Sequence, residues 1–124
     1  MLFTFARNQQ LVAMKQTVTQ MRLDAIPVGD SSQAQGVLVI HQIVAAASNV
    51  AALRVFVDTS NDGIEWVLGV SVVVEDVVAV TRSFNFGVVT EYFRLRIELD
   101  PADSGTDDGP AIVLFDLRVR TYQP

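Results

Sequence analysis

The sequence predicts an all-β protein, a single antiparallel β-sandwich that is jelly-roll-like in topology and has eight or nine strands. Three observations support this prediction. Valine makes up about one residue in six, and β-branched residues favour the pleated, half-buried backbone of a strand. Apolar and polar residues alternate in two C-terminal segments, which indicates strands with one buried face. Turn-forming residues separate the apolar segments at regular intervals, as is typical of a sandwich.

Length and composition exclude several classes of protein. The 124 residues suffice for one domain, residues 1–124. The absence of cysteine excludes zinc fingers, disulfide scaffolds and thiol enzymes. The 14 acidic residues outnumber the 9 basic ones, so we expect no nucleic-acid partner. The most apolar stretch, Val37 to Ala47, is shorter than the roughly 18 residues that cross a bilayer. We therefore expect no membrane partner, and the N-terminus does not resemble a secretory signal.

The N-terminal part of the chain predicts two strands and a loop. Leu2 to Ala6 is predicted to form a short first strand. Gln9 to Leu23 is ambiguous, because four apolar residues fall at helical spacing while Thr17 to Thr19 is β-branched. We predict a strand there, with a helix as the alternative. Ala25 to Gln35, which contains proline, glycine and serine, is predicted to be the longest early loop.

The middle of the chain predicts a series of apolar strands separated by turns. Asp62 and Gly63 are predicted to form the tip of a tight hairpin, because glycine tolerates a positive φ without a Cβ clash. The predicted strands are Val37 to Ala46, Ala51 to Asp58, Ile64 to Leu68, Val70 to Glu75 and Val77 to Phe86.

Two similar strands are predicted near the C-terminus, Tyr92 to Leu99 and Ile112 to Thr121. The segment between them, Asp100 to Pro110, contains prolines, glycines and aspartates that cannot continue a β-ladder. Its four aspartates offer the oxygen ligands that calcium accepts, but their spacing does not match the twelve-residue calcium loop. We favour a solvated turn and predict no metal site.

The sequence does not predict an assembled catalytic site. His41 is the only histidine and lies inside an apolar strand, where we interpret it as a structural residue or a subunit contact rather than a catalytic base. The acidic residues gather in turns, and the dispersed glycines form no phosphate-binding loop. We therefore predict no catalytic residue, no cofactor and no enzymatic activity.

Outward-facing arginines and tyrosines suggest a site that binds a partner protein. Tyr92, Arg94 and Arg96 share one strand face, and Arg118 and Arg120 share another. If the two strands are neighbours, these side chains form one compact patch. Arginine and tyrosine are enriched at protein interfaces, whereas cross-strand pairing with Glu98 and Asp116 is the structural alternative.

A second indication of an interface is the excess of apolar residues. Val70 to Val80, Val37 to Ala47 and the segment from Gly87 to Val89 carry apolar residues on both predicted faces. A two-sheet sandwich buries one face of each strand, so the outer face needs a cover. We expect a neighbouring subunit to supply it.

One part of the sequence resembles two known groups of proteins. Leu53-Arg-Val-Phe-Val-Asp-Thr-Ser-Asn-Asp-Gly-Ile-Glu-Trp66, followed by Glu91-Tyr-Phe-Arg-Leu-Arg-Ile97, resembles a pattern in small β-sandwich proteins of tailed bacteriophage particles. It also resembles discoidin-type carbohydrate- or lipid-binding domains. In both groups a Ser-x-Asp-Gly-x-x-Trp hairpin precedes a strand that carries aromatic-Arg-x-Arg. The chain is short for a discoidin domain and lacks its frequent terminal cysteines, so the phage resemblance has fewer obstacles.

The phage resemblance implies a non-enzymatic virion protein, such as a capsid decoration or cement subunit. Its implied partners are a major capsid protein or another virion protein, together with further copies of itself. Its implied location is the virion and, during assembly, the host cytoplasm. The alternative, a discoidin-like carbohydrate-binding module, requires an exposed aromatic platform. We expect Trp66 to pack into the sandwich instead.

Overall fold

The computed structural model describes residues 2–13, 19–45, 52–69, 71–76, 80–100 and 111–123. Within these ranges the chain forms nine β-strands and no helix. The strands are β1 (Leu2–Ala13), β2 (Thr19–Arg22), β3 (Ile26–Pro27), β4 (Gln33–Ala45), β5 (Ala52–Ser60), β6 (Ser71–Asp76), β7 (Val80–Gly87), β8 (Tyr92–Asp100) and β9 (Ala111–Tyr122). The described part of the chain contains no helix that could span a membrane.

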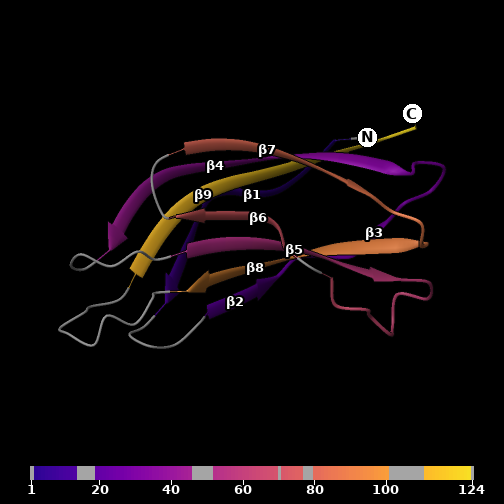
Figure 1. The fold of residues 1–124 in the computed structure, drawn as a ribbon, viewed down its shortest axis with the longest axis horizontal. Coiled ribbons are helices and arrows are strands. Elements are labelled where there is room, and N and C mark those ends of the chain that lie inside the picture. Colours follow the sequence, from indigo (N-terminus) through magenta and orange to yellow (C-terminus); the bar gives the residue numbers. More distant parts are fainter. Residues whose placement is uncertain are drawn as a thin grey trace.

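The strands form two antiparallel sheets that pack face to face as a jelly roll (Figure 1). Sheet A has the order β1-β9-β4-β7, and sheet B has the order β2-β8-β5-β6, with β3 also paired to β8. The chain pairs as one long hairpin would: β1 with β9, β2 with β8, β4 with β7, and β5 with β6. Rolling this hairpin places β9 beside β4 and β8 beside β5, which is the jelly-roll arrangement. The predicted fold class is confirmed.

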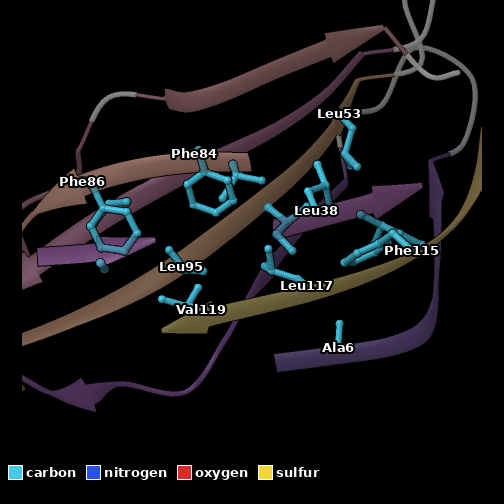
Figure 2. Close-up of a cluster of buried hydrophobic side chains, with 14 of the residues drawn as sticks. Ala6, Leu38, Leu53, Phe84, Phe86, Leu95, Phe115, Leu117 and Val119 are labelled. Carbon is cyan, nitrogen blue, oxygen red and sulfur yellow. The ribbon is translucent and has the colours of Figure 1, made fainter. Parts of the chain in front are cut away.

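The core lies between the two sheets and is apolar throughout its centre (Figure 2). Every second residue of β8 and of β9 is fully buried: Phe93, Leu95, Ile97 and Leu99, and Val113, Phe115, Leu117 and Val119. Phe86 of sheet A meets Phe93 of sheet B edge to face, with ring centroids 5.4 Å apart, a favoured aromatic geometry. The alternation in the sequence therefore identifies the residues that join the sheets.

The described N-terminal residues are extended, but the strand boundaries differ from the prediction. β1 is one long strand from Leu2 to Ala13, whose register shifts between Thr4 and Ala6 and between Ala6 and Gln9. Asn8 has a φ of 48°, which a β-bulge accommodates. The prediction of a single strand from Gln9 to Leu23 is wrong, because its described ends belong to β1 in one sheet and to β2 in the other. Both ends are extended as predicted, and residues 14–18 lie outside the described residues. The predicted loop from Ala25 to Gln35 is too long, because β3 pairs with β8 and β4 begins at Gln33.

The predicted strand Ile64 to Leu68 is wrong, and the preceding hairpin is wider than a two-residue turn. A single bridge joins Thr59 to Val67, and we call residues 60–69, which connect β5 to the neighbouring β6, the sheet B loop. Gly63 has a φ of 76°, which confirms the predicted use of glycine. The local reason for the wider turn is that Ser60 and Asp62 accept hydrogen bonds from the backbone N–H groups of residues 63–65. The chain therefore forms a loop that is capped by its own side chains.

Candidate functional site

The five residues predicted to bind a partner do not form one patch. Tyr92, Arg94 and Arg96 lie on the outer face of β8 in sheet B, whereas Arg118 and Arg120 lie on the outer face of β9 in sheet A. The two sheets pack through their inner faces, so these two groups point to opposite sides of the sandwich (Figure 1). The prediction of a compact patch is therefore wrong, because β8 and β9 pair with β5 and β4 rather than with each other. Contact of these residues with a partner stays a prediction.

Arg94 and Arg96 are held by a buried carboxylate instead of projecting freely into solvent. The side chain of Asp58 is fully buried, while those of Arg94 and Arg96 are 15% and 8% exposed. Arg94 Nε and Arg96 Nε each donate to Asp58 Oδ2 at 3.2 Å, and Arg96 Nη2 donates to Asp58 Oδ1 at 3.3 Å. The backbone N–H of Gly69 also donates to Asp58 Oδ1 at 3.1 Å. These charge-assisted and backbone hydrogen bonds compensate for the burial of Asp58.

The sheet B loop is fixed on this ion cluster by its own hydrogen bonds. Ser60 Oγ accepts from the backbone N–H of Gly63 at 2.8 Å, and Asp62 Oδ1 accepts from those of Ile64 and Glu65 at 2.8 and 2.9 Å. The backbone N–H groups of Ile64 and Glu65, which donate to this carboxylate, hold the pKa of Asp62 below its ordinary value. At the far end of the loop, a Cβ on Gly69 would overlap the carbonyl oxygen of Val57. Only glycine allows this close approach.

Trp66 lies on the outer face of sheet B rather than in the core. It is only partly buried and is not a member of the core cluster. The guanidinium carbon of Arg94 lies 4.4 Å from the centroid of its ring, within the range of a cation–π contact. The prediction that Trp66 packs into the sandwich is therefore wrong, because its ring contacts Arg94 on the outer face of sheet B and is not part of the core cluster. The side chain instead shields the Asp58 cluster from solvent.

The outer face of sheet A carries partly exposed aliphatic side chains among the described residues. Its register places Val12 opposite Ile112, with Leu114 two residues further along β9, and Val37 and Val39 on the neighbouring β4. The exposed Arg118 and Arg120 continue the same face, and Arg120 Nη2 donates to Gln35 Oε1 at 3.2 Å. We call these seven residues the sheet A face: Val12, Val37, Val39, Ile112, Leu114, Arg118 and Arg120. Val37 and Val39 alternate with buried residues of β4, so this strand has apolar residues on both faces, as predicted.

The other apolar stretches give a more limited picture. Val88 is buried and Val89 is fully exposed, so this short segment does have apolar residues on two sides. For Val70 to Val80, the predicted two-faced apolar character falls outside the described side chains.

His41 and Asp116 lie beside irregularities in two strands of sheet A, β1 and β4, which flank β9. The register of β4 shifts between Ile40 and Gln42, and that of β1 shifts between Ala6 and Gln9. Asp116 of β9, which lies between them, contacts His41 Nε2 at 3.0 Å through Oδ2 and accepts the backbone N–H of Asn8 at 2.6 Å through Oδ1. The Asn8 N–H and then His41 hold the pKa of Asp116 below its usual value. This geometry supports a structural interpretation of His41.

The described residues form a surface hollow but no cluster of potential metal ligands. No group of three or more potential metal ligands occurs among them. Asp100 contacts Arg54 Nη1 at 3.1 Å, while Asp103, Asp107 and Asp108 of the predicted acidic loop lie outside the described residues. One hollow of about 310 Å³ is lined by residues 59–62 and 65–67 and by Thr90, so it joins the sheet B loop to the β7–β8 connection.

Sequence reasoning did not single out Asp58, although it organises the outer face of sheet B. A signal was available in its position. Phe56 and Asp58 alternate with Val55 and Val57, which places an aspartate on the outward face of a predicted strand. The missing information was that β5 pairs with β8, which sets Asp58 opposite Arg94.

Comparison with known proteins shows the fold alone. No protein-family model matches the sequence, and no curated protein is significantly similar to it. Among solved structures, the PBSX exported protein XepA is similar with a TM-score of 0.59 and 11% identity, covering 100% of this chain and 37% of that one. The VP2 subviral particle of infectious bursal disease virus is similar with a TM-score of 0.60 and 18% identity, covering 99% of this chain and 32% of that one. The chain therefore spans about a third of the length of each.

Proposed function

We propose that this chain is a non-enzymatic structural protein of a virus particle, of the decoration or cement type. The observation that carries the proposal is the sheet A face, where partly exposed aliphatic residues lie beside two exposed arginines. A patch of this kind is typical of a surface that another protein covers. The jelly-roll fold shared with a viral VP2 particle protein adds support. The proposed partners are a major capsid protein or another virion protein, and the proposed locations are the virion and, during assembly, the host cytoplasm.

The geometry around the charged residues supports a structural role over catalysis. His41 and Asp116 lie on the outer surface of a sheet, where Asp116 contacts His41 and accepts the backbone N–H of Asn8. Asp58 is completely enclosed by Arg94, Arg96 and Gly69, so no substrate can reach it. Of the five predicted contact residues, Arg118 and Arg120 are accessible for direct binding. Arg94 and Arg96 act indirectly, because they hold the sheet B loop.

Cosedimentation with assembled shells of a tailed bacteriophage tests the proposed function. The wild-type chain should pellet with the shells, and Leu114→Lys should reduce the bound fraction at least about 10-fold because it places a charge inside an apolar contact. Gln20→Lys adds the same charge to the exposed outer side of β2 and should bind as the wild type does. Failure of the wild type to bind any shell, or equal binding by Leu114→Lys, would contradict the proposal.

A carbohydrate-binding module is the second candidate, and Trp66 is the observation that favours it. Trp66 is partly exposed, is oriented by Arg94 and lines the hollow of about 310 Å³ together with Asn61 and Glu65. Polar side chains beside a fixed aromatic ring suit a sugar. Binding of a glycan-array ligand that disappears in a folded Trp66→Ala variant would favour this module, provided that shell binding is absent.

A further inference from the structure

The two loops at one end of the sandwich combine exposed apolar and acidic residues. Ile64, Val67 and Leu68 of the sheet B loop are 82%, 70% and 59% exposed, and Val89 of the β7–β8 connection is fully exposed. Glu65 and Glu91 are exposed in the same two segments. Thr90 lines a common hollow with Thr59 to Asp62, so the segments are adjacent. We call this surface the loop end, defined by Ile64, Glu65, Val67, Leu68, Val89 and Glu91.

The loop end is complementary in charge to the sheet A face of the same molecule. The sheet A face carries Arg118 and Arg120, and Asp116 beside them is already bonded to His41 and Asn8. Among the described residues of that outer face, no other carboxylate is available to these arginines. Both surfaces combine apolar residues with charged ones, but the charged residues are basic on one surface and acidic on the other. Complementary charges beside apolar residues provide both attraction and register.

The loop end is also held in one conformation before it meets a partner. Asp62 bonds two backbone N–H groups of the loop, and Asp58 bonds Gly69 at the end of the loop and Arg94 beneath Trp66. A fixed loop loses little conformational freedom when it binds. The buried ion cluster therefore presents Ile64, Val67 and Leu68 as a rigid apolar projection.

We propose that the partner of the sheet A face is the loop end of a second copy of this chain. This inference rests on the proposed function and refines it: copies joined in this way bind the shell cooperatively, so Leu114→Lys weakens shell binding by breaking the contact between copies. The two surfaces differ, so the contact is head-to-tail. A pair of copies joined in this way still has one free sheet A face and one free loop end, to which further copies can bind. Packing the sheet A face on the sheet A face of another copy would instead bring four arginines together without an available carboxylate on the described part of that face.

A charge-exchange experiment tests this contact. The first variant is Arg118→Glu with Arg120→Glu, and the second is Glu65→Arg with Glu91→Arg. All four residues are exposed, so both variants should fold, which circular dichroism checks. Sedimentation velocity should show concentration-dependent association of the wild type that weakens with salt. Each variant alone should associate at least about 10-fold more weakly, because like charges then face each other. An equimolar mixture of the two variants should regain association.

The remaining outcomes each decide against the proposal. A wild type that stays monomeric at all concentrations overturns it, and shell binding by that monomer would leave the proposed function intact. Variants that associate as the wild type does, or a mixture that stays dissociated, also overturn it. Loss of association only in the arginine variant indicates contact between two sheet A faces. If a double variant misfolds, the single changes Arg120→Glu and Glu65→Arg provide the same test.

Discussion

Asp58 shows how one buried charge can organise a surface. Its carboxylate is fully buried and receives hydrogen bonds from Arg94, Arg96 and the backbone of Gly69. Arg96 Nη1 also donates to Glu98 Oε1 at 3.1 Å, and the guanidinium carbon of Arg96 lies 4.2 Å from the centroid of the Phe56 ring. Such a cluster is costly to desolvate, so it contributes less to net stability than its number of bonds suggests. Its specific contribution is to fix where the sheet B loop lies.

We predict that Asp58→Asn lowers the free energy of unfolding by about 3 kcal/mol, because it removes the buried charge that two nearly buried guanidinium groups share and leaves Arg96 paired only with Glu98. Urea denaturation measures this change. Arg118→Ala is the matched control on the exposed face of sheet A and should change stability by no more than about 0.5 kcal/mol. Equal effects of the two substitutions would show that the Asp58 cluster behaves as an ordinary surface ion pair.

At the scale of elements, the sheet B loop is stabilised by side-chain-to-backbone hydrogen bonds in place of a ladder. Ser60 and Asp62 bond the N–H groups of Gly63, Ile64 and Glu65, while one bridge between Thr59 and Val67 closes the loop. These bonds favour the charged form of Asp62, so its pKa is lower in the folded protein than in the unfolded chain.

This shift predicts a pH-dependent loop. A carboxyl whose folded pKa is depressed contributes stability that is present above the unfolded value, near 3.8, and that is lost as the pH falls through the folded value. Melting temperatures of the wild type should therefore fall more steeply below about pH 4 than those of Asp62→Asn, which keeps an acceptor oxygen but does not titrate. Asp116, whose pKa is also lowered, titrates in both proteins, so the difference between the two profiles isolates Asp62. Parallel profiles would contradict the prediction.

At the scale of the whole molecule, one apolar cluster joins both sheets. Its members include Leu38, Phe115 and Leu117 from sheet A and Leu53 and Leu95 from sheet B (Figure 2). Tight packing of this kind transmits a local defect across the core. The sheets are therefore expected to unfold together rather than one after the other.

We predict that Leu117→Ala costs about 2 to 5 kcal/mol, since it removes a fully buried side chain and leaves a cavity. Although Leu117 belongs to sheet A, the fluorescence of Trp66 on sheet B should report the same denaturation midpoint as far-ultraviolet circular dichroism. Leu2→Ala, at a position that is 63% exposed, should be nearly neutral. Two separate midpoints would show that the sheets unfold independently.

The fold could be predicted from the sequence because alternation is a local signal. Tyr92 to Leu99 and Ile112 to Thr121 predict β8 and β9 to within a residue or two, and their buried residues match the predicted inner faces. Two short segments were harder to predict. Ile26 and Pro27 form a strand only because β8 offers an edge, and Ile64 to Leu68 is apolar without joining a sheet.

The candidate site was harder to predict because it depends on which strands are neighbours. Arg94 and Arg118 occupy equivalent positions in two similar strands, yet one faces a buried aspartate and the other faces solvent. Nothing local distinguishes them, since the difference arises from β5 pairing with β8. The position of Trp66 was missed for the same reason, because a turn motif does not specify which face of the sheet its side chains contact.

The position of β9 has a consequence for protein synthesis. β9 follows every other described strand in the sequence, yet it is a central strand of sheet A, between β1 and β4. While the ribosome is still making residues 111–122, β1 and β4 lack the strand that separates and pairs them, and open strand edges promote aggregation. The pairing of Leu2 with Arg120 joins the first and last described strands, and such distant contacts slow folding. We expect sheet A to be completed only after β9 has been translated. A nascent chain that stalls before this point therefore exposes the unpaired edges of β1 and β4, to which other chains can pair.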